Sequence, residues 1–130
     1  MGSTPIIPAT NKGAMVKTSH IGFKVIYVNY KGKILPAGVR TFGSFEKKDW
    51  NVQKEGWGPF MVFNDKWAAA SYLKEFCRWG EIKEVEYESS DEKCVYYSPD
   101  KKIPIDIALQ GIASTSNVRL AKRFRFTIYE

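Results

Sequence analysis

Residues 58–80 read GPFMVFNDKWAAASYLKEFCRWG, and this stretch decides the fold class. Its apolar run at 59–63 lies between turn-forming residues, which predicts a short buried strand. Asn64 is a favourable N-cap for a helix over 65–79, and Gly80 stands where a C-cap glycine is expected. The i, i+4, i+7 and i+8 spacing predicts that the buried face of this helix consists of Ala69, Leu73, Phe76 and Cys77.

The sequence before this stretch predicts a β-hairpin followed by a loop. Residues 21–29 are β-branched and aromatic on both faces, which predicts a strand that is buried on both sides. The turn at 30–33 leads into a second strand over 34–41, in which Pro36 predicts a bulge or an edge position. Residues 42–58 are polar and contain glycine, so we expect a long loop with one short strand.

The sequence after the helix is dominated by strand patterns. Residues 81–89 alternate between apolar residues that face the core and glutamates that face outward. A short strand follows at 94–97, and residues 103–110 fit either a strand or a short helical turn. The last long strand is predicted over 118–129.

Together these elements predict an α+β protein in which a mostly antiparallel sheet packs against one main helix. Residues 1–19 read as an extended N-terminal tail, and residues 20–130 read as a single domain. The helix residues Ala69, Leu73 and Phe76 are expected to be buried against Val25, Val85 and Phe126.

The composition narrows the classes of function. The chain has 130 residues, 44% of them hydrophobic, and a formal net charge of +6. No apolar run is long enough to span a bilayer, and no secretory signal is recognisable, so we expect an intracellular, cytoplasmic protein, or one located in the host cell if it is viral, with no membrane partner. Two cysteines outside a C-x-x-C arrangement suit a reducing compartment. A disulfide between Cys77 and Cys94 is the alternative, which only the geometry of the fold can exclude. The positive charge favours anionic partners such as nucleic acid.

The last strand carries the clearest candidate site. Arg119, Arg123 and Arg125 share one face, and guanidinium groups form paired hydrogen bonds with phosphates. Lys122 interrupts the opposite face, which predicts that the strand bulges or frays near its start, and it adds a fourth cation to this candidate nucleic-acid or phosphate site. The opposite face, which we expect in the core, consists of Leu120, Phe124, Phe126 and Ile128. The alternative is structural: if the strand pairs with the strand whose outward face is formed by Glu84, Glu86 and Glu88, opposite charges face each other and cancel.

A second candidate is Trp57, which stands between two glycines in Gly56-Trp57-Gly58-Pro59. An exposed tryptophan at a loop tip could anchor a protein partner, because tryptophan is enriched among interface hot spots. The same residue could equally cover the core.

Several kinds of catalysis lack the residues they need. The only histidine is His20, and there is neither a cluster of cysteine and histidine for zinc nor a phosphate-binding loop. We therefore expect no catalytic residue, no metal and no cofactor.

One segment supplies an enzymatic alternative. Ser114-Thr115-Ser116 and the residues after it resemble the Ser-Thr-Ser strand that lines the nicotinamide pocket of arginine-type ADP-ribosyltransferases. The resemblance implies a catalytic glutamate on a later strand. Only Glu130 follows, and the pair Glu84-Val85-Glu86 lies upstream, in the reverse order.

The region 21–88 resembles small α+β domains of unassigned activity from phages and bacteria. The resemblance is carried by Phe23-Lys24-Val25, by the strand-to-helix stretch 58–65 and by Glu84-Val85-Glu86. It implies a fold and no activity. We therefore expect a non-enzymatic accessory or assembly protein, of phage or viral origin, that acts through a binding surface. A protein partner is favoured over nucleic acid, and the oligomeric state is left open.

Overall fold

The computed structural model describes residues 19–36, 44–76, 78–109 and 115–128. In chain order the elements are β2 (Ser19–Val28), β3 (Ile34–Pro36), β4 (Asn51–Val52), β5 (Phe60–Phe63), α1 (Lys66–Phe76), β6 (Glu81–Ser89), β7 (Cys94–Ser98), β8 (Lys101–Pro104), α2 (Ile105–Ala108), a 3-10 turn (Thr115–Asn117) and β9 (Val118–Phe126). The predicted strands and helix are present, several with shifted ends. Residues 1–18 of the predicted tail and 37–41 of the predicted second strand lie outside the described residues.

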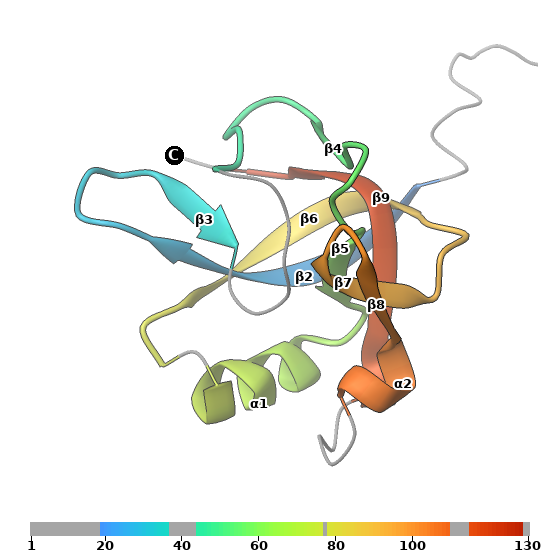
Figure 1. The fold of residues 1–130 in the computed structure, drawn as a ribbon. Coiled ribbons are helices and arrows are strands. Elements are labelled where there is room, and N and C mark those ends of the chain that lie inside the picture. The colour runs from blue at the N-terminus through green and yellow to red at the C-terminus, as the bar shows by residue number, and fades with distance from the viewer. Residues whose placement is uncertain (1–18, 37–43, 77, 110–114, 129–130) are drawn as a thin grey trace, which may run out of the picture.

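The main sheet closes on itself. Strand β2 pairs with β6, β6 with β9, β9 with β5, and β5 again with β2 through Phe23 and Phe63. Strand β3 extends the ring beside β2, and β4 extends it beside β9. Every one of these pairings is antiparallel, as predicted, and Figure 1 shows the strands curving around a common interior. The sequence predicted a sheet packed against a helix, whereas the structure is a small barrel-like sheet with a helix on one side.

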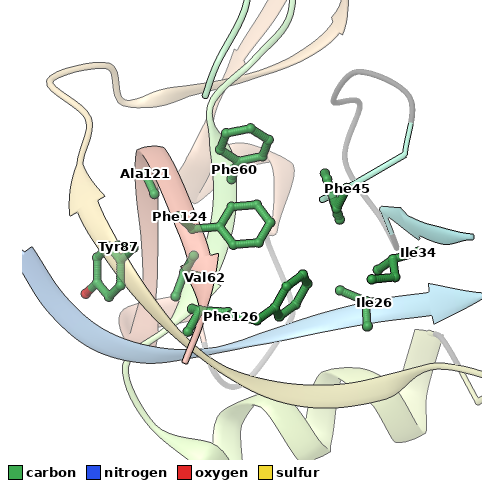
Figure 2. Close-up of a cluster of buried hydrophobic side chains, with 10 residues drawn as sticks. Ile26, Ile34, Phe45, Phe60, Val62, Tyr87, Ala121, Phe124 and Phe126 are labelled. Atoms are coloured by element: carbon green, nitrogen blue, oxygen red, sulfur yellow. The ribbon is translucent and has the colours of Figure 1, made fainter. Parts of the chain in front are cut away.

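The interior of the barrel is filled by aromatic rings that meet edge to face. Phe124 of β9 lies at the centre, with ring centroids 4.9 Å from Phe60 and 5.1 Å from Phe45 (Figure 2). Ile26 and Val85 are completely buried in the same cluster. Aromatic pairs in this geometry stabilise a core beyond the effect of area burial alone.

A second core lies between the barrel and α1. It contains Val25, Met61 and Phe63 from the strands, and Ala68, Ala69 and Tyr72 from the helix. Because successive strand residues point to opposite faces, β2 supplies Val25 to this core and Ile26 to the barrel interior. The prediction that this strand is buried on both sides is therefore confirmed.

The predicted face of the helix is only partly correct. Ala69 is buried and Leu73 packs against the second core, but Phe76 is 49% exposed. Tyr72 takes the buried position instead and stacks against Phe76, which lies at the end of α1, with a centroid separation of 5.2 Å. Cys77 lies outside the described residues.

The expected partners of the helix also need correction. Val25 does pack beneath α1, but Val85 and Phe126 face into the barrel and belong to the other core. Closure of the sheet gives it an inner and an outer surface, so half of its apolar residues cannot reach the helix.

Both helix ends differ from the expectation. Asp65, rather than Asn64, accepts a hydrogen bond at its side chain from the backbone N–H of Trp67, at 3.2 Å. The helix ends at Phe76, and Gly80 is not among the described glycines in the left-handed conformation.

Strand β9 contains the predicted bulge. Arg123 lies opposite Glu88, and Ala121 lies opposite Ser89, so Lys122 is the extra residue. The bulge shifts the alternation, and both Leu120 and Ala121 are buried while Lys122 is exposed. Ile128, expected in the core, is 74% exposed because it lies beyond the end of β9.

Strands β7 and β8 form a separate hairpin, and the ambiguous region 103–110 divides between the end of β8 and the single turn of α2. The side chain of Tyr96 in β7 packs directly on Gly58, where a Cβ would lie only 3.0–3.1 Å from the tyrosine, and this contact places the hairpin against the loop before β5. Cys94 in β7 is a free thiol, and Cys77, its possible bridge partner, lies outside the described residues.

Candidate interaction surfaces

The outer face of β6 and β9 carries two of the predicted arginines. Arg123 lies opposite Glu88, and Arg125 lies opposite Glu86. The Arg123 Nη2 to Glu88 Oε2 distance is 2.5 Å, and the Arg125 Nε to Glu86 Oε1 distance is 2.9 Å. This is the structural alternative considered from the sequence, in which the glutamate strand faces the arginine strand.

Both carboxylates are held in their charged form. A hydrogen bond from Ser19 Oγ, 2.7 Å from Glu86 Oε2, lowers the pKa of Glu86, and Arg125 lowers it further. The hydrogen bond from Arg123 lowers the pKa of Glu88 and raises the pKa of Arg123. The positive charges of this face are therefore matched by negative charges of the same face.

Trp50 covers both guanidinium groups. Its ring centroid lies 4.1 Å from the guanidinium carbon of Arg123 and 4.7 Å from that of Arg125. The neighbouring Asn51 is buried and exchanges hydrogen bonds of 2.7 and 3.2 Å with the backbone of Glu46, which fixes this loop. The two arginines thus have a carboxylate at their edge and an indole against their face, an arrangement that stabilises the fold.

The other two predicted cations lie apart from this pair. Arg119 is opposite Val62 of β5, and its Nη1 donates to the carbonyl oxygens of Ser116 and Val118 at 2.9 Å. Lys122 extends from the bulge, 3.9 Å from Glu88. Glu84, which was expected to face an arginine, instead accepts a hydrogen bond from Thr127 Oγ1 at 2.8 Å. The geometry does not bring the four cations together as one unpaired phosphate site.

Trp57 is half-buried rather than an exposed tip. Its carbonyl oxygen accepts a hydrogen bond from Gln53 Nε2 at 2.9 Å, and Gly56 before it adopts φ +84°. The glycines of this motif shape the turn and seat the β7–β8 hairpin. A role of Trp57 in binding a protein stays a prediction.

In the segment that resembles an ADP-ribosyltransferase strand, the residues from Val118 on are in β9, but the described part of the Ser-Thr-Ser element is not in a strand. Ser114 lies outside the described residues, and Thr115–Asn117 forms a 3-10 turn ahead of β9. A hollow lined by Val118 and Arg119 at the start of β9 also contains Glu92, whose oxygens accept hydrogen bonds from Tyr96 Oη at 2.5 Å and from Gln53 Nε2 at 2.8 Å. Glu92 thus joins the hairpin to the loop before β5, and the enzymatic alternative stays a prediction.

Sequence reasoning missed a lysine inside the barrel. Lys24 is 3% exposed, and its Nζ donates to the carbonyl oxygen of Met61 at 3.0 Å. The ring centroids of Phe45, Phe60 and Phe124 lie 5.3–5.9 Å from this nitrogen. Burial lowers the pKa of Lys24 to about 7. The sequence did contain a signal for this burial: Lys24 stands two residues before Ile26, so both side chains lie on the same face of the strand.

Sequence reasoning also missed the most exposed tryptophans. Trp67, at the start of α1, is 81% exposed, and Trp79, after its end, is 76% exposed. Phe76 between them is half-exposed, whereas most other phenylalanines of the described chain are in the two cores.

Comparison of the chain with protein families, with curated proteins and with solved structures found no match. Within the described ranges, no group of histidine, cysteine, aspartate and glutamate side chains is arranged to hold a metal ion. Neither α1 nor α2 combines the length and the apolar composition that a membrane crossing requires.

Proposed function

We propose that this protein is a non-catalytic accessory or assembly protein that binds another protein through the aromatic residues at the two ends of α1. The observation that carries the proposal is the exposure of Trp67 and Trp79, at 81% and 76%. Tryptophan is the residue type most enriched at the energetic centres of protein interfaces. The opposite side of α1 is already used, because Ala68, Ala69 and Tyr72 pack against the barrel.

The size of the surface fits a protein partner. The two tryptophans are twelve positions apart: nine of these lie in α1 and rise about 14 Å at 1.5 Å per residue, and the three beyond the helix add at most about 10 Å. A standard interface buries about 800 Å² on each partner, so one interface can cover both side chains. Figure 1 shows α1 along one side of the barrel, with no other described element over its far side.

A protein partner is favoured over a membrane surface by the arrangement of the rings. Trp67 and Phe76 are nine positions apart, which places them on opposite flanks of an α-helix. A helix that lies in a membrane interface needs its apolar residues on one face. Separate rings on two flanks are better suited to individual pockets of a folded partner.

The non-catalytic part of the proposal rests on the sequence, which has one histidine and no recognised catalytic set. An intracellular location and a phage or viral origin stay predictions. The pairing of Arg123 and Arg125 with glutamates supports a protein partner over nucleic acid for the β6–β9 face.

The test compares two double variants. Trp67→Ser with Trp79→Ser removes the proposed anchors, and Val52→Ser with Ile128→Ser removes two other exposed apolar side chains as a control. A protein captured from the native host by the wild-type chain would be purified, and its Kd for each variant measured by calorimetry.

We expect the tryptophan variant to weaken binding by at least about 30-fold, the loss for a single hot-spot residue that contributes about 2 kcal/mol. The control variant should stay within about threefold. Equal binding by the wild type and the tryptophan variant, or the absence of any purified protein that binds directly, would refute the proposal.

A further inference from the structure

The net positive charge of the chain comes entirely from its first 45 residues. This segment contains six lysine or arginine residues and no aspartate or glutamate, whereas residues 46–130 contain the remaining 14 basic and all 14 acidic residues. Of the six, the described residues include Lys24, Lys31 and Lys33. Lys24 is buried inside the barrel, so Lys31 and Lys33 are the exposed cations of this segment that the structure places.

Both lysines lie on the turn that joins β2 to β3, beside the most exposed aromatic ring of the described chain. Tyr30 is 92% exposed, and Lys31 Nζ lies 5.7 Å from its ring centroid. Among the described residues, neither Lys31 nor Lys33 forms an ion pair. This differs from Arg123 and Arg125 of β9, which have glutamate partners. Figure 1 shows the β2–β3 hairpin projecting away from the barrel.

Hydrogen bonds of Asn29 hold the backbone of this turn, so these side chains are displayed from a defined conformation. The Asn29 side-chain oxygen accepts hydrogen bonds from the backbone N–H groups of Lys31 and Lys33, both at 2.9 Å. The Asn29 backbone makes two more, with Lys33 and Gly32, at 3.0 and 2.9 Å. Gly32 adopts φ +81°, which only glycine takes without strain.

We propose that the tip of this hairpin, formed by Tyr30, Lys31 and Lys33, binds single-stranded nucleic acid. The two ammonium groups contact backbone phosphates, and the tyrosine ring stacks on an unpaired base. Stacking on an aromatic ring combined with nearby cations is how proteins hold single strands without sequence preference. A duplex offers phosphates but keeps its bases stacked, so it cannot use the tyrosine. An acidic polypeptide offers charge but no base.

This inference is independent of the proposed function, because it concerns another element and another partner. Its test uses fluorescence anisotropy of labelled oligo-dT over a range of salt concentrations, with the full chain. A duplex of the same length and polyglutamate serve as competitors. The tip variant combines Tyr30→Ala, Lys31→Gln and Lys33→Gln.

The β7–β8 turn offers a matched control. Tyr97, Lys101 and Lys102 form a similar group, with Lys101 Nζ 6.0 Å from the Tyr97 ring, and Asp100 lies beside them in the sequence. Tyr97→Ala with Lys101→Gln and Lys102→Gln removes one tyrosine and two lysine side chains, the same residue types and the same number of charges as the tip variant. Thermal unfolding by circular dichroism confirms that each variant is folded.

We expect the tip variant to lose at least about fivefold in affinity from the tyrosine alone. Its slope of log affinity against log salt should fall by about 1.4, for two lost phosphate contacts on a single strand. The control should keep both the affinity and the slope within experimental error. Equal losses in the two variants, competition by duplex or polyglutamate as strong as by oligo-dT, or no binding of the wild type at low salt would each overturn the inference.

Discussion

Lys24 makes the stability of this protein depend on pH in a direction that can be worked out from the structure. The pKa of Lys24 in the folded chain is about 7, against 10.5 in its ordinary state. Between these two values the unfolded chain binds a proton that the folded chain does not. The free energy of unfolding therefore rises with pH across this window and is lowest below about pH 7, where the ammonium must stay inside the barrel.

The magnitude follows from the size of the window. One proton changes the free energy of unfolding by about 1.4 kcal/mol for each pH unit. Because the folded group is half-protonated at pH 7, the gain from pH 7 to pH 9.5 is about 3 kcal/mol. This is a large part of the usual stability of a small domain.

Urea unfolding at several pH values measures this contribution when Lys24→Met is compared with the wild type. Methionine keeps most of the side-chain volume and cannot titrate, although it leaves the Met61 carbonyl without its donor. We expect the difference in stability between the two proteins to change by about 3 kcal/mol, in favour of the wild type, from pH 7 to pH 9.5. Lys33→Met, at an exposed position, controls for the loss of a positive charge.

Parallel pH profiles for the wild type and Lys24→Met would refute this reasoning. They would mean that the ammonium reaches water in the folded state, or that the three rings and the carbonyl oxygen fully compensate for its burial.

Two further predictions concern stability. Gly22→Ala should lower the free energy of unfolding by about 3 kcal/mol, since the added Cβ would lie 2.7 Å from Val62 Cγ1 and 2.8 Å from the Phe63 carbonyl oxygen. Gly32→Ala, where a Cβ meets no atom within 4 Å, should lower it less. Urea unfolding measures both variants, and the reverse order of stabilities would contradict this prediction. Glu86→Gln with Glu88→Gln should flatten the loss of stability in acid, because folding lowers the pKa values of both groups, and the stability they contribute is lost as the pH falls below their ordinary value of 4.5. Thermal unfolding from about pH 3 to about pH 7 measures this loss. The same fall in melting temperature with pH in the variant and the wild type would mean that the pairing does not stabilise the fold.

The elements could be predicted from the sequence because each has a local signal. The bulge at Lys122 is an example, since a charged residue in an apolar alternation requires the strand to shift its phase. Closure of the barrel has no such signal. It depends on the four residues Phe60–Phe63, which pair with β9 along their length and also meet β2 at Phe23.

The candidate site was harder to predict because exposure is a tertiary property. The helical spacing of Phe76 fits a buried stripe, but α1 ends at this residue, and Tyr72 fills the core instead. Lys24 is the reverse case, a charged residue that is buried in the structure. A lysine inside an apolar strand is usually read as the residue that faces water, whereas its position two residues from Ile26 placed it in the barrel.

The net charge of the chain can be interpreted only once the segment that carries it is known. The three arginines of β9 are the most conspicuous cations in the sequence, yet residues 46–130, which contain them, have no net charge. Glutamates on the paired strand hold Arg123 and Arg125, so these residues add stability to the sheet rather than attraction for an anion. The excess that can attract an anion lies where no acidic residue is near in the sequence. Within the described chain that condition is met at the β2–β3 turn, where a hydrogen-bonded backbone displays two lysines and an exposed tyrosine.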